Sequence, residues 1–169
     1  MTKENRPSAD TNPDASTAAP SAPRVVDVLN ELLETTREAE FGFQACADEA
    51  AAARLQEVFY HRAEQCQQAA DELVRLIWRF GGSPAEGDAA SGALHRGWVH
   101  IKGAVGADTD LSMLEECERR EDAAVARYRE ALAQNLPPEV RSFVERQAQC
   151  AQRNHDQIGD LRSEASSRG

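Results

Sequence analysis

Residues 55–84 read LQEVFYHRAEQCQQAADELVRLIWRFGGSP, and this stretch decides the fold class. Its apolar and small residues recur at steps of three and four, which places them on one face of an α-helix. That inner face consists of Leu55, Phe59, Arg62, Cys66, Ala69, Leu73, Leu76 and Phe80. The glycines and proline of residues 81–84 end the helix, because glycine is favoured after a helix C-terminus and proline cannot continue one.

Three further segments show the same helical period. The first starts near Val25, and its inner positions are Val25, Leu29, Leu32, Thr36, Ala39 and Phe43. The next is predicted to be capped by Asp110, and its inner positions are Leu111, Leu114, Glu118, Glu121, Val125, Tyr128 and Leu132. The last follows two prolines, which a first helical turn tolerates well, and its inner positions are Val140, Val144, Gln147, Ala151, Ile158 and Leu161.

The connections between these helices predict how the chain is arranged. Tight turns near Ala51 and at residues 135–138 make two antiparallel helical hairpins. The middle connection has about 30 residues and a predicted short helix over residues 92–105, so it is long enough to cross the whole bundle. We therefore predict an all-α fold, a ferritin-like four-helix bundle with one long crossover. Residues 24–163 form this domain, and residues 1–23 and 164–169 are expected to be disordered ends.

Composition and charge exclude several classes of protein. The chain has 169 residues, 41% hydrophobic residues and a formal net charge of −10. No apolar run approaches the roughly 20 residues of a membrane span, and the N-terminus has no apolar signal segment, so a cytoplasmic location is expected. Lysine and arginine are interleaved with acidic residues, which argues against a nucleic-acid partner. The four cysteines form no CxxC pair and are expected to be buried thiols.

Polar residues interrupt the middle of each inner face. Positions counted from the two turns bring these residues to similar depth in the bundle. The predicted polar layer consists of Glu40, Arg62, Gln65, Glu118, Glu121, Gln147 and His155. Buried charges must be paired or must bind a metal ion, so this layer is the candidate site. No nucleophile or phosphate-loop motif occurs, and no catalytic or cofactor-binding residue is predicted.

Two interpretations of this layer stay open. Di-iron bundles use a Glu from each of two helices and Glu-x-x-His from the other two. Here Gln152 stands at the Glu position before His155, and the second helix offers Arg62. A complete di-iron centre is therefore not predicted, but a site for iron or another divalent metal remains an alternative, with Glu40, Glu118, Glu121 and His155 as its ligands. The other interpretation is a buried Arg–Glu hydrogen-bonded network that fixes the register of the helices.

Several segments, in the same order along the chain, carry a resemblance to a known family. They are residues 29–34 (LNELLE), 40–43 (EFGF), 92–98 (GALHRGW), 118–122 (ERRED), 128–132 (YREAL), 136–138 (LPP) and 155–156 (HD). The sequence resembles an uncharacterised bacterial ferritin-like family, domain-of-unknown-function family twenty-three eighty-three. The resemblance implies four long helices with a helical crossover and no established activity. Ferritin-like relatives include stress-associated bundles and di-iron oxidases.

The sequence thus favours a non-catalytic, homo-oligomeric bundle protein, with a stress-associated role implied only by the resemblance. Four apolar residues lie off or at the edge of the inner faces and are expected to be exposed in an interface: Val26, Val58, Ile77 and Phe143. The alternative function is a metal-binding redox or storage protein with a variant carboxylate and histidine site. No particular protein partner is indicated.

Overall fold

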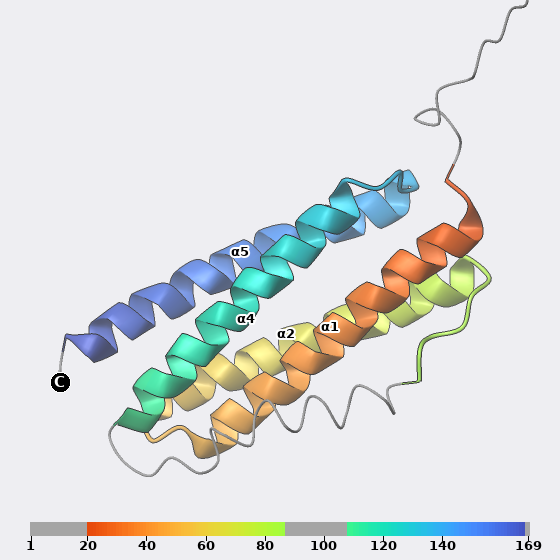
Figure 1. The fold of residues 1–169 in the computed structure, drawn as a ribbon. Helices are drawn as coiled ribbons and strands as arrows, with labels where there is room; N and C mark the ends of the chain where they lie inside the picture. Colours follow the sequence, from red (N-terminus) through yellow and green to blue (C-terminus); the bar gives the residue numbers. More distant parts are fainter. Residues whose placement is uncertain (1–19, 87–107, 168–169) are drawn as a thin grey trace, which may run out of the picture.

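Four long helices make up the computed structural model, which describes residues 20–86 and 108–167. They are α1 (Ala22–Glu49), α2 (Ala53–Arg79), α4 (Asp108–Leu132) and α5 (Pro138–Ser166). Figure 1 shows them side by side in one bundle. The predicted all-α fold and the turn near Ala51 are confirmed. The short helix predicted over residues 92–105 lies outside the described residues.

The helices form two antiparallel hairpins, α1 with α2 and α4 with α5 (Figure 1). Helix α4 begins at the end of the bundle where α1 turns into α2, whereas α2 ends at the opposite end of the bundle. This is the predicted single-crossover arrangement. Because α2 and α4 start at the same end of the bundle, they run parallel to each other.

Asp110 differs from its predicted role as the cap of α4. Helix α4 begins at Asp108, so Asp110 lies inside the first turn of α4. Its carboxylate accepts hydrogen bonds from the backbone N–H groups of Ala51 (2.9 Å) and Ala52 (3.1 Å). The first N–H groups of a helix have no partner within the helix, and the alanine that precedes α2 offers no capping side chain. Asp110 therefore caps the turn between α1 and α2, and it fixes α4 against that turn.

The outer helices extend beyond their predicted limits. Helix α1 includes residues 22 and 23, because Pro23 fits in a first helical turn. Helix α5 continues through residues 164–166, which were expected to be disordered. Glu164 pairs with Arg54 of α2 at 3.1 Å, and Ala165 packs against buried apolar residues. These contacts stabilise the last helical turn of α5.

Ion pairs align α2 with α5. Arg54 pairs with Glu164, Glu72 with Arg146, and Arg79 with Glu139. The three positions on α2 are separated by 18 and 7 residues, and their partners on α5 step back by the same numbers. Eighteen and seven residues are close to whole numbers of helical turns, so each set lies on one face of its helix. The pairs therefore record an antiparallel register, although each exposed pair contributes little stability.

The apolar core is divided in two. The first core lies at the end where α1 begins, and its fully buried residues are Val25, Leu29, Leu33, Leu73, Ile77, Val140, Phe143 and Val144. The second core lies near the α1–α2 turn, and its fully buried residues are Cys46, Ala47, Phe59, Met113, Leu114, Cys117 and Ile158. Polar side chains lie between the two cores. Within the described parts of the chain, no helix is long and apolar enough to cross a membrane.

Two residues that were expected to be exposed belong to the first core. Ile77 and Phe143 are buried, with 0% and 1% of their surface exposed. Ile77 lies one turn after Leu73, and Phe143 lies next to Val144, so the inner faces of α2 and α5 are wider than a single row of residues. Val26 and Val58 are half-buried. In residues 20–86 and 108–167, the large hydrophobic residues that are exposed are instead Phe41, Tyr60 and Trp78.

Candidate functional site

A band of polar residues, here called the mid-bundle layer, separates the two cores. All four helices contribute to it: Thr36 of α1; Arg62, Gln65 and Cys66 of α2; Glu121 and Tyr128 of α4; Gln147, Cys150, Asn154 and Gln157 of α5. A cavity of about 40 Å³ lies within this layer. That volume is room for about two or three water molecules.

Arg62 is the buried cation of the layer, with 3% of its surface exposed. Its Nη1 donates to Gln65 Oε1 at 2.9 Å, and its Nη2 donates to Gln157 Oε1 at 3.3 Å. Both acceptors are neutral carboxamides. Burial lowers the pKa of Arg62, and the charge of Glu121 acts in the opposite direction. The guanidinium stays charged in any case, because arginine does not lose its proton in proteins.

Glu121 is the buried acid of the layer, with 5% of its surface exposed. Its carboxylate lines the cavity and, among the described residues, has neither a hydrogen bond nor an ion pair. Burial raises its pKa to about 7, while the charges of Arg62 and His155 act to lower it. At neutral pH the carboxyl is therefore close to half protonated, and Arg62 interacts with it only through space.

The other predicted acids lie apart from Glu121. Glu118 forms an ion pair with Arg162 at 3.0 Å and lies over Gly159, where an added Cβ would come within 3.2 Å of Oε1. Glu40 is half-buried on α1. Burial and the charge of Asp71 raise its pKa, and Arg37 acts in the opposite direction. Neither acid pairs with Arg62 in the described structure.

His155 is oriented toward two aspartates. Its Nε2 lies 3.0 Å from Asp122 Oδ1, and its Nδ1 lies 3.2 Å from Asp156 Oδ1. The hydrogen bond with Asp156 raises its pKa, as does the charge of Asp122, against a lowering by burial. With both ring nitrogens engaged in this way, the imidazole is a poor metal ligand.

These positions bear on the predicted metal site. Two of the four predicted ligands, Glu118 and His155, have other ion-pair partners. The described residues contain no group of three or more His, Cys, Asp or Glu side chains that could hold a metal ion. The cation of Arg62 also lies in the layer and would repel a metal ion. The residues present therefore do not fit a di-iron centre. The predicted Arg–Glu hydrogen bond is not formed either, because Arg62 donates to two glutamines.

Gln157, an exposed residue that contacts Arg62, is one member of the layer that the sequence did not indicate. It does not lie on the apolar row of α5, so helical period alone could not identify it. The charged residues on α2 and α5 contain a signal for it. The register that joins Arg54 to Glu164 and Glu72 to Arg146 places residue 156 opposite Arg62, and Gln157 is the next residue. Gln65 and Gln147, both predicted, line the cavity.

The thiol of Cys66, in the layer, is kept protonated by its surroundings. Burial raises the pKa of Cys66 to about 12, and Arg62 offsets this only in part. Cys150 Sγ lies 3.8 Å from Gln65 Oε1 and 3.9 Å from Asn154 Oδ1. Because the thiolate is the reactive form, Cys66 is not an activated nucleophile.

Sequence comparison assigns the family. The family model described as Domain of unknown function (DUF2383) matches residues 24–134, which include α1, α2 and α4. The chain belongs to the DUF2383 family. The match includes Arg62 and Glu121, whereas Gln157 on α5 lies beyond it. No curated protein matches the sequence significantly.

Structure comparison supports the fold of this DUF2383 protein. A mutant of Mycobacterium smegmatis Dps1 superposes with a TM-score of 0.69 at 14% sequence identity. The match covers 84% of this chain and 97% of the Dps1 chain. The likeness confirms the predicted ferritin-like four-helix bundle. At this level of identity it bears on the fold of the DUF2383 bundle and not on its chemistry.

Proposed function

We propose that this protein is a non-catalytic, ferritin-like bundle that works by assembling with copies of itself. In this proposal, the mid-bundle layer holds the helices in register and takes the place of a di-iron centre. The observation that carries the proposal is the buried Arg62 guanidinium between Gln65 and Gln157. A fixed positive charge at this depth opposes the binding of a divalent cation.

The electrostatics of the layer support this function. With Glu121 ionised, the layer contains one buried cation and one buried anion, which is a balanced set. A divalent metal would add two positive charges beside Arg62, and among the described residues Glu121 is the only buried acid. Side chains such as Gln65, Gln147 and Gln157 are weak ligands for iron, and they suit a hydrogen-bonded network better.

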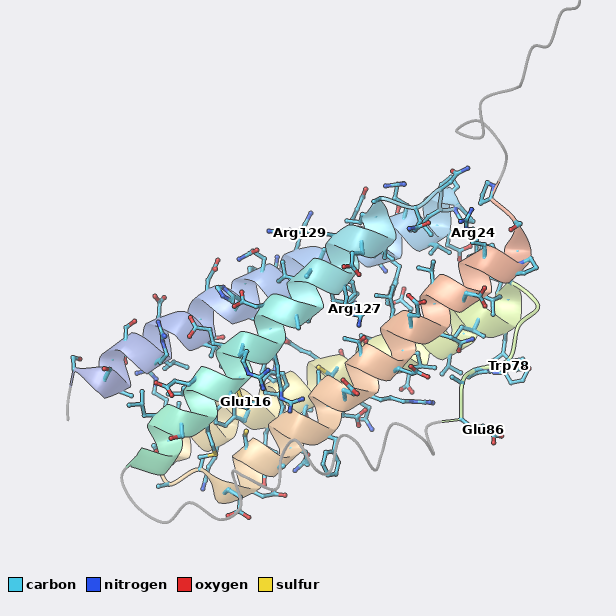
Figure 2. The ribbon with its side chains drawn as sticks, in the orientation of Figure 1. Arg24, Trp78, Glu86, Glu116, Arg127 and Arg129 are labelled. Carbon is cyan, nitrogen blue, oxygen red and sulfur yellow. The ribbon has the colours of Figure 1, made fainter. Side chains whose placement is uncertain are left out.

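Exposed aromatic residues support assembly. Trp78 has 60% of its surface exposed, and it lies near the C-terminal end of α2 (Figure 2). Phe41 and Tyr60, also exposed, belong to the same α1–α2 hairpin. Tryptophan and tyrosine are enriched at the centres of protein interfaces. A homo-oligomer that covers Trp78 is therefore part of the proposal, as are a cytoplasmic location and the stress-associated role implied by the family resemblance.

The alternative function is a metal-binding redox or storage protein. One observation favours it: Glu121 is a buried carboxylate without a hydrogen-bond partner in the described structure, and it lines a cavity beside Cys66 and Cys150. A bound cation would satisfy such a carboxylate. Against this, Glu40, Glu118 and His155 each have other neighbours.

Metal content distinguishes the two functions. The untagged full-length protein is incubated anaerobically with ferrous iron, desalted and analysed by elemental mass spectrometry, next to the Glu121→Gln variant. The proposal expects both proteins to carry no metal above background. Two irons per chain would establish a variant di-iron protein. About one metal per chain, lost in Glu121→Gln, would establish the alternative site. Either result would refute the proposed function.

A further inference from the structure

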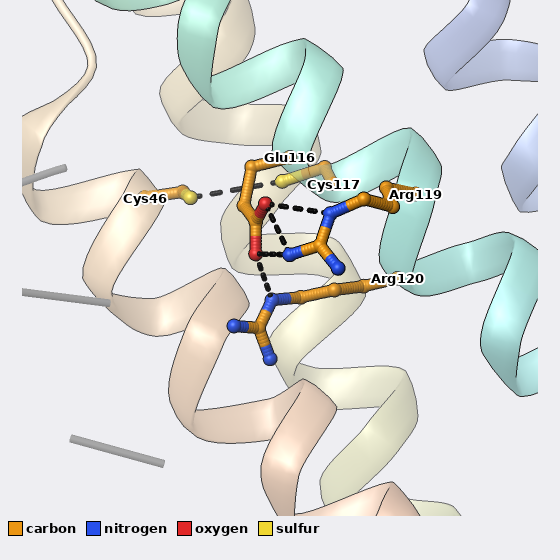
Figure 3. Close-up of polar contacts among 5 residues, drawn as sticks. All are labelled: Cys46, Glu116, Cys117, Arg119 and Arg120. Carbon is orange, nitrogen blue, oxygen red and sulfur yellow. Dashed lines mark hydrogen bonds and ion pairs between the residues drawn. The ribbon is translucent and has the colours of Figure 1, made fainter. Parts of the chain in front are cut away.

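Two cysteines in the second core lie in direct contact. Cys46 Sγ of α1 and Cys117 Sγ of α4 are 3.6 Å apart, and both residues are fully buried (Figure 3). Both are free thiols. They belong to different hairpins, so this contact joins the two halves of the bundle.

We propose that Cys46 and Cys117 are an oxidative modification site, at which a hydroperoxide converts the two thiols into a disulfide that links α1 to α4. A disulfide has an S–S length of about 2.05 Å. The two sulfurs must therefore approach each other by about 1.5 Å, a movement that two side chains can share. The site lies outside the mid-bundle layer and does not depend on the proposed function.

The neighbouring contacts hold the two sulfurs opposite each other. Asp110 binds the backbone of the α1–α2 turn two helical turns before Cys117, so α4 is fixed against the end of α1 close to the thiols. Phe43 and Phe59 stack nearby in the same core, with ring centroids 6.3 Å apart. A pair that is pre-aligned in this way loses little further freedom when the bond forms.

The surroundings of Cys117 set the order of the reaction. Burial raises the pKa of Cys117 well above its ordinary value, and Cys46 and the charge of Glu116 act in the same direction. Burial would also raise the pKa of Glu116, but hydrogen bonds from Arg119 and Arg120, each at 2.6 Å, lower it below its ordinary value (Figure 3). Glu116 therefore stays anionic beside Cys117, and Cys117 stays a thiol.

Cys46 is accordingly the attacking group, and the S–H of Cys117 can donate to its sulfur. The Cys46 sulfur attacks one peroxide oxygen as its S–H proton departs, the O–O bond breaks, and the other oxygen takes that proton and leaves as water or an alcohol. Cys46 is then a sulfenic acid. The sulfur of Cys117 attacks the sulfur of Cys46, the S–O bond breaks, and the hydroxide takes the Cys117 proton and leaves as water. The two thiols lose two electrons, which the hydroperoxide accepts.

The reaction is expected to be slow, because both thiols are buried and the peroxide must enter through local opening of the helix ends. The product ties two distant parts of the chain together. Closure of such a long loop stabilises the folded protein, and the melting temperature should rise by on the order of 10 °C. Reduction should reverse the change.

To test this, the folded full-length protein is treated with hydrogen peroxide over hours and is then analysed by peptide mapping under non-reducing conditions. The proposal expects a Cys46–Cys117 cross-linked peptide, a loss of two hydrogen atoms in mass, and a higher melting temperature that dithiothreitol reverses. The Cys66→Ala/Cys150→Ala double variant should behave in the same way, and Cys46→Ala should not form the link.

Three results would overturn the inference. The first is oxidation of Cys66 or Cys150 while Cys46 and Cys117 stay free. The second is a sulfinic acid at Cys46 without the cross-link. The third is a cross-link that forms only after unfolding in urea, which would mean that the folded geometry does not produce it.

Discussion

At the scale of single residues, the mid-bundle layer depends on how Arg62 and Glu121 share one buried region. Arg62 is satisfied by the carboxamides of Gln65 and Gln157, while Glu121 has only the through-space charge of Arg62 and His155. The carboxyl can respond to its burial by taking up a proton, and the guanidinium cannot. The two residues should therefore respond differently to substitution and to pH.

Removal of the Arg62 side chain should be strongly destabilising. The Arg62→Ala variant leaves the carboxamides of Gln65 and Gln157 without their donor and the buried Glu121 carboxylate without the opposing charge of Arg62. It should lose about 3 kcal/mol of unfolding free energy. The loss should be smaller at pH 5 than at pH 8, because Glu121 can then become neutral. Urea denaturation at both pH values checks this. The control is Arg75→Ala, an exposed arginine on the same helix, which should change the stability by less than about 0.5 kcal/mol. Equal losses in the two variants would contradict the role of Arg62.

Glu121 should make the protein less stable as pH rises. Its pKa is raised from 4.5 to about 7 on folding, so the folded state binds its proton more tightly than the unfolded state. The contribution of Glu121 to the free energy of unfolding is favourable below pH 4.5. About 3 kcal/mol of it is lost as pH rises toward 7. Glu121→Gln stays neutral and should not show this loss.

Denaturant titrations of wild type and Glu121→Gln across pH 4.5 to 8 test the prediction. The two proteins should be similar at the acidic end, and the variant should become the more stable one as pH rises. Glu115→Gln, at an exposed position on α4, controls for the loss of one surface charge. Parallel stability curves for wild type and Glu121→Gln would rule out a titrating buried carboxyl.

At the scale of helices, sequence and structure agree on the elements and disagree on which way their polar groups point. The regular spacing of apolar residues and the glycine and proline stops predicted the helices, because both signals are local in the sequence. His155 and Glu118 could not be placed in this way. Each lies at the edge of an inner face, and small rotations of α4 and α5 decide whether they meet Glu121 or their actual partners, Asp122 and Arg162.

Asp110 joins α4 to the α1–α2 turn, whereas the sequence predicted that it would cap its own helix. Asp110→Ala removes both acceptors of the α1–α2 turn N–H groups. It should cost about 1–2 kcal/mol, in the range of a lost helix cap. Thermal unfolding followed by circular dichroism measures the effect. Asp160→Ala, an exposed aspartate on α5, is the control and should be neutral. A neutral Asp110→Ala would mean that water replaces the carboxylate at no cost.

At the scale of the whole molecule, the fold could be predicted because hairpins, stop signals and one long connection leave few arrangements for four helices. The exposed surface could not be predicted in the same way. Ile77 and Phe143 were expected outside and are buried, while Trp78 was not singled out and is exposed. The width of an apolar face depends on how closely neighbouring helices approach, which one sequence does not reveal.

Self-association through Trp78 follows from the proposed function. The wild-type protein should sediment as a species heavier than its 18.5 kDa monomer. Trp78→Ala should shift it toward the monomer and weaken association at least about 10-fold, as expected for an interface tryptophan. Analytical ultracentrifugation over a range of concentrations measures both, with Asp160→Ala as the control. A wild-type protein that is monomeric at every concentration would contradict the proposal.

We propose that a polar layer centred on the Arg62 guanidinium takes the place of a metal centre in this bundle. The most direct measurement is anomalous diffraction at the iron edge, from crystals of the full-length protein grown and soaked anaerobically with ferrous iron. We expect no anomalous peak in the mid-bundle layer, and electron density for Arg62 between Gln65 and Gln157. An iron peak bound by Glu121, with Arg62 displaced from the layer, would contradict it.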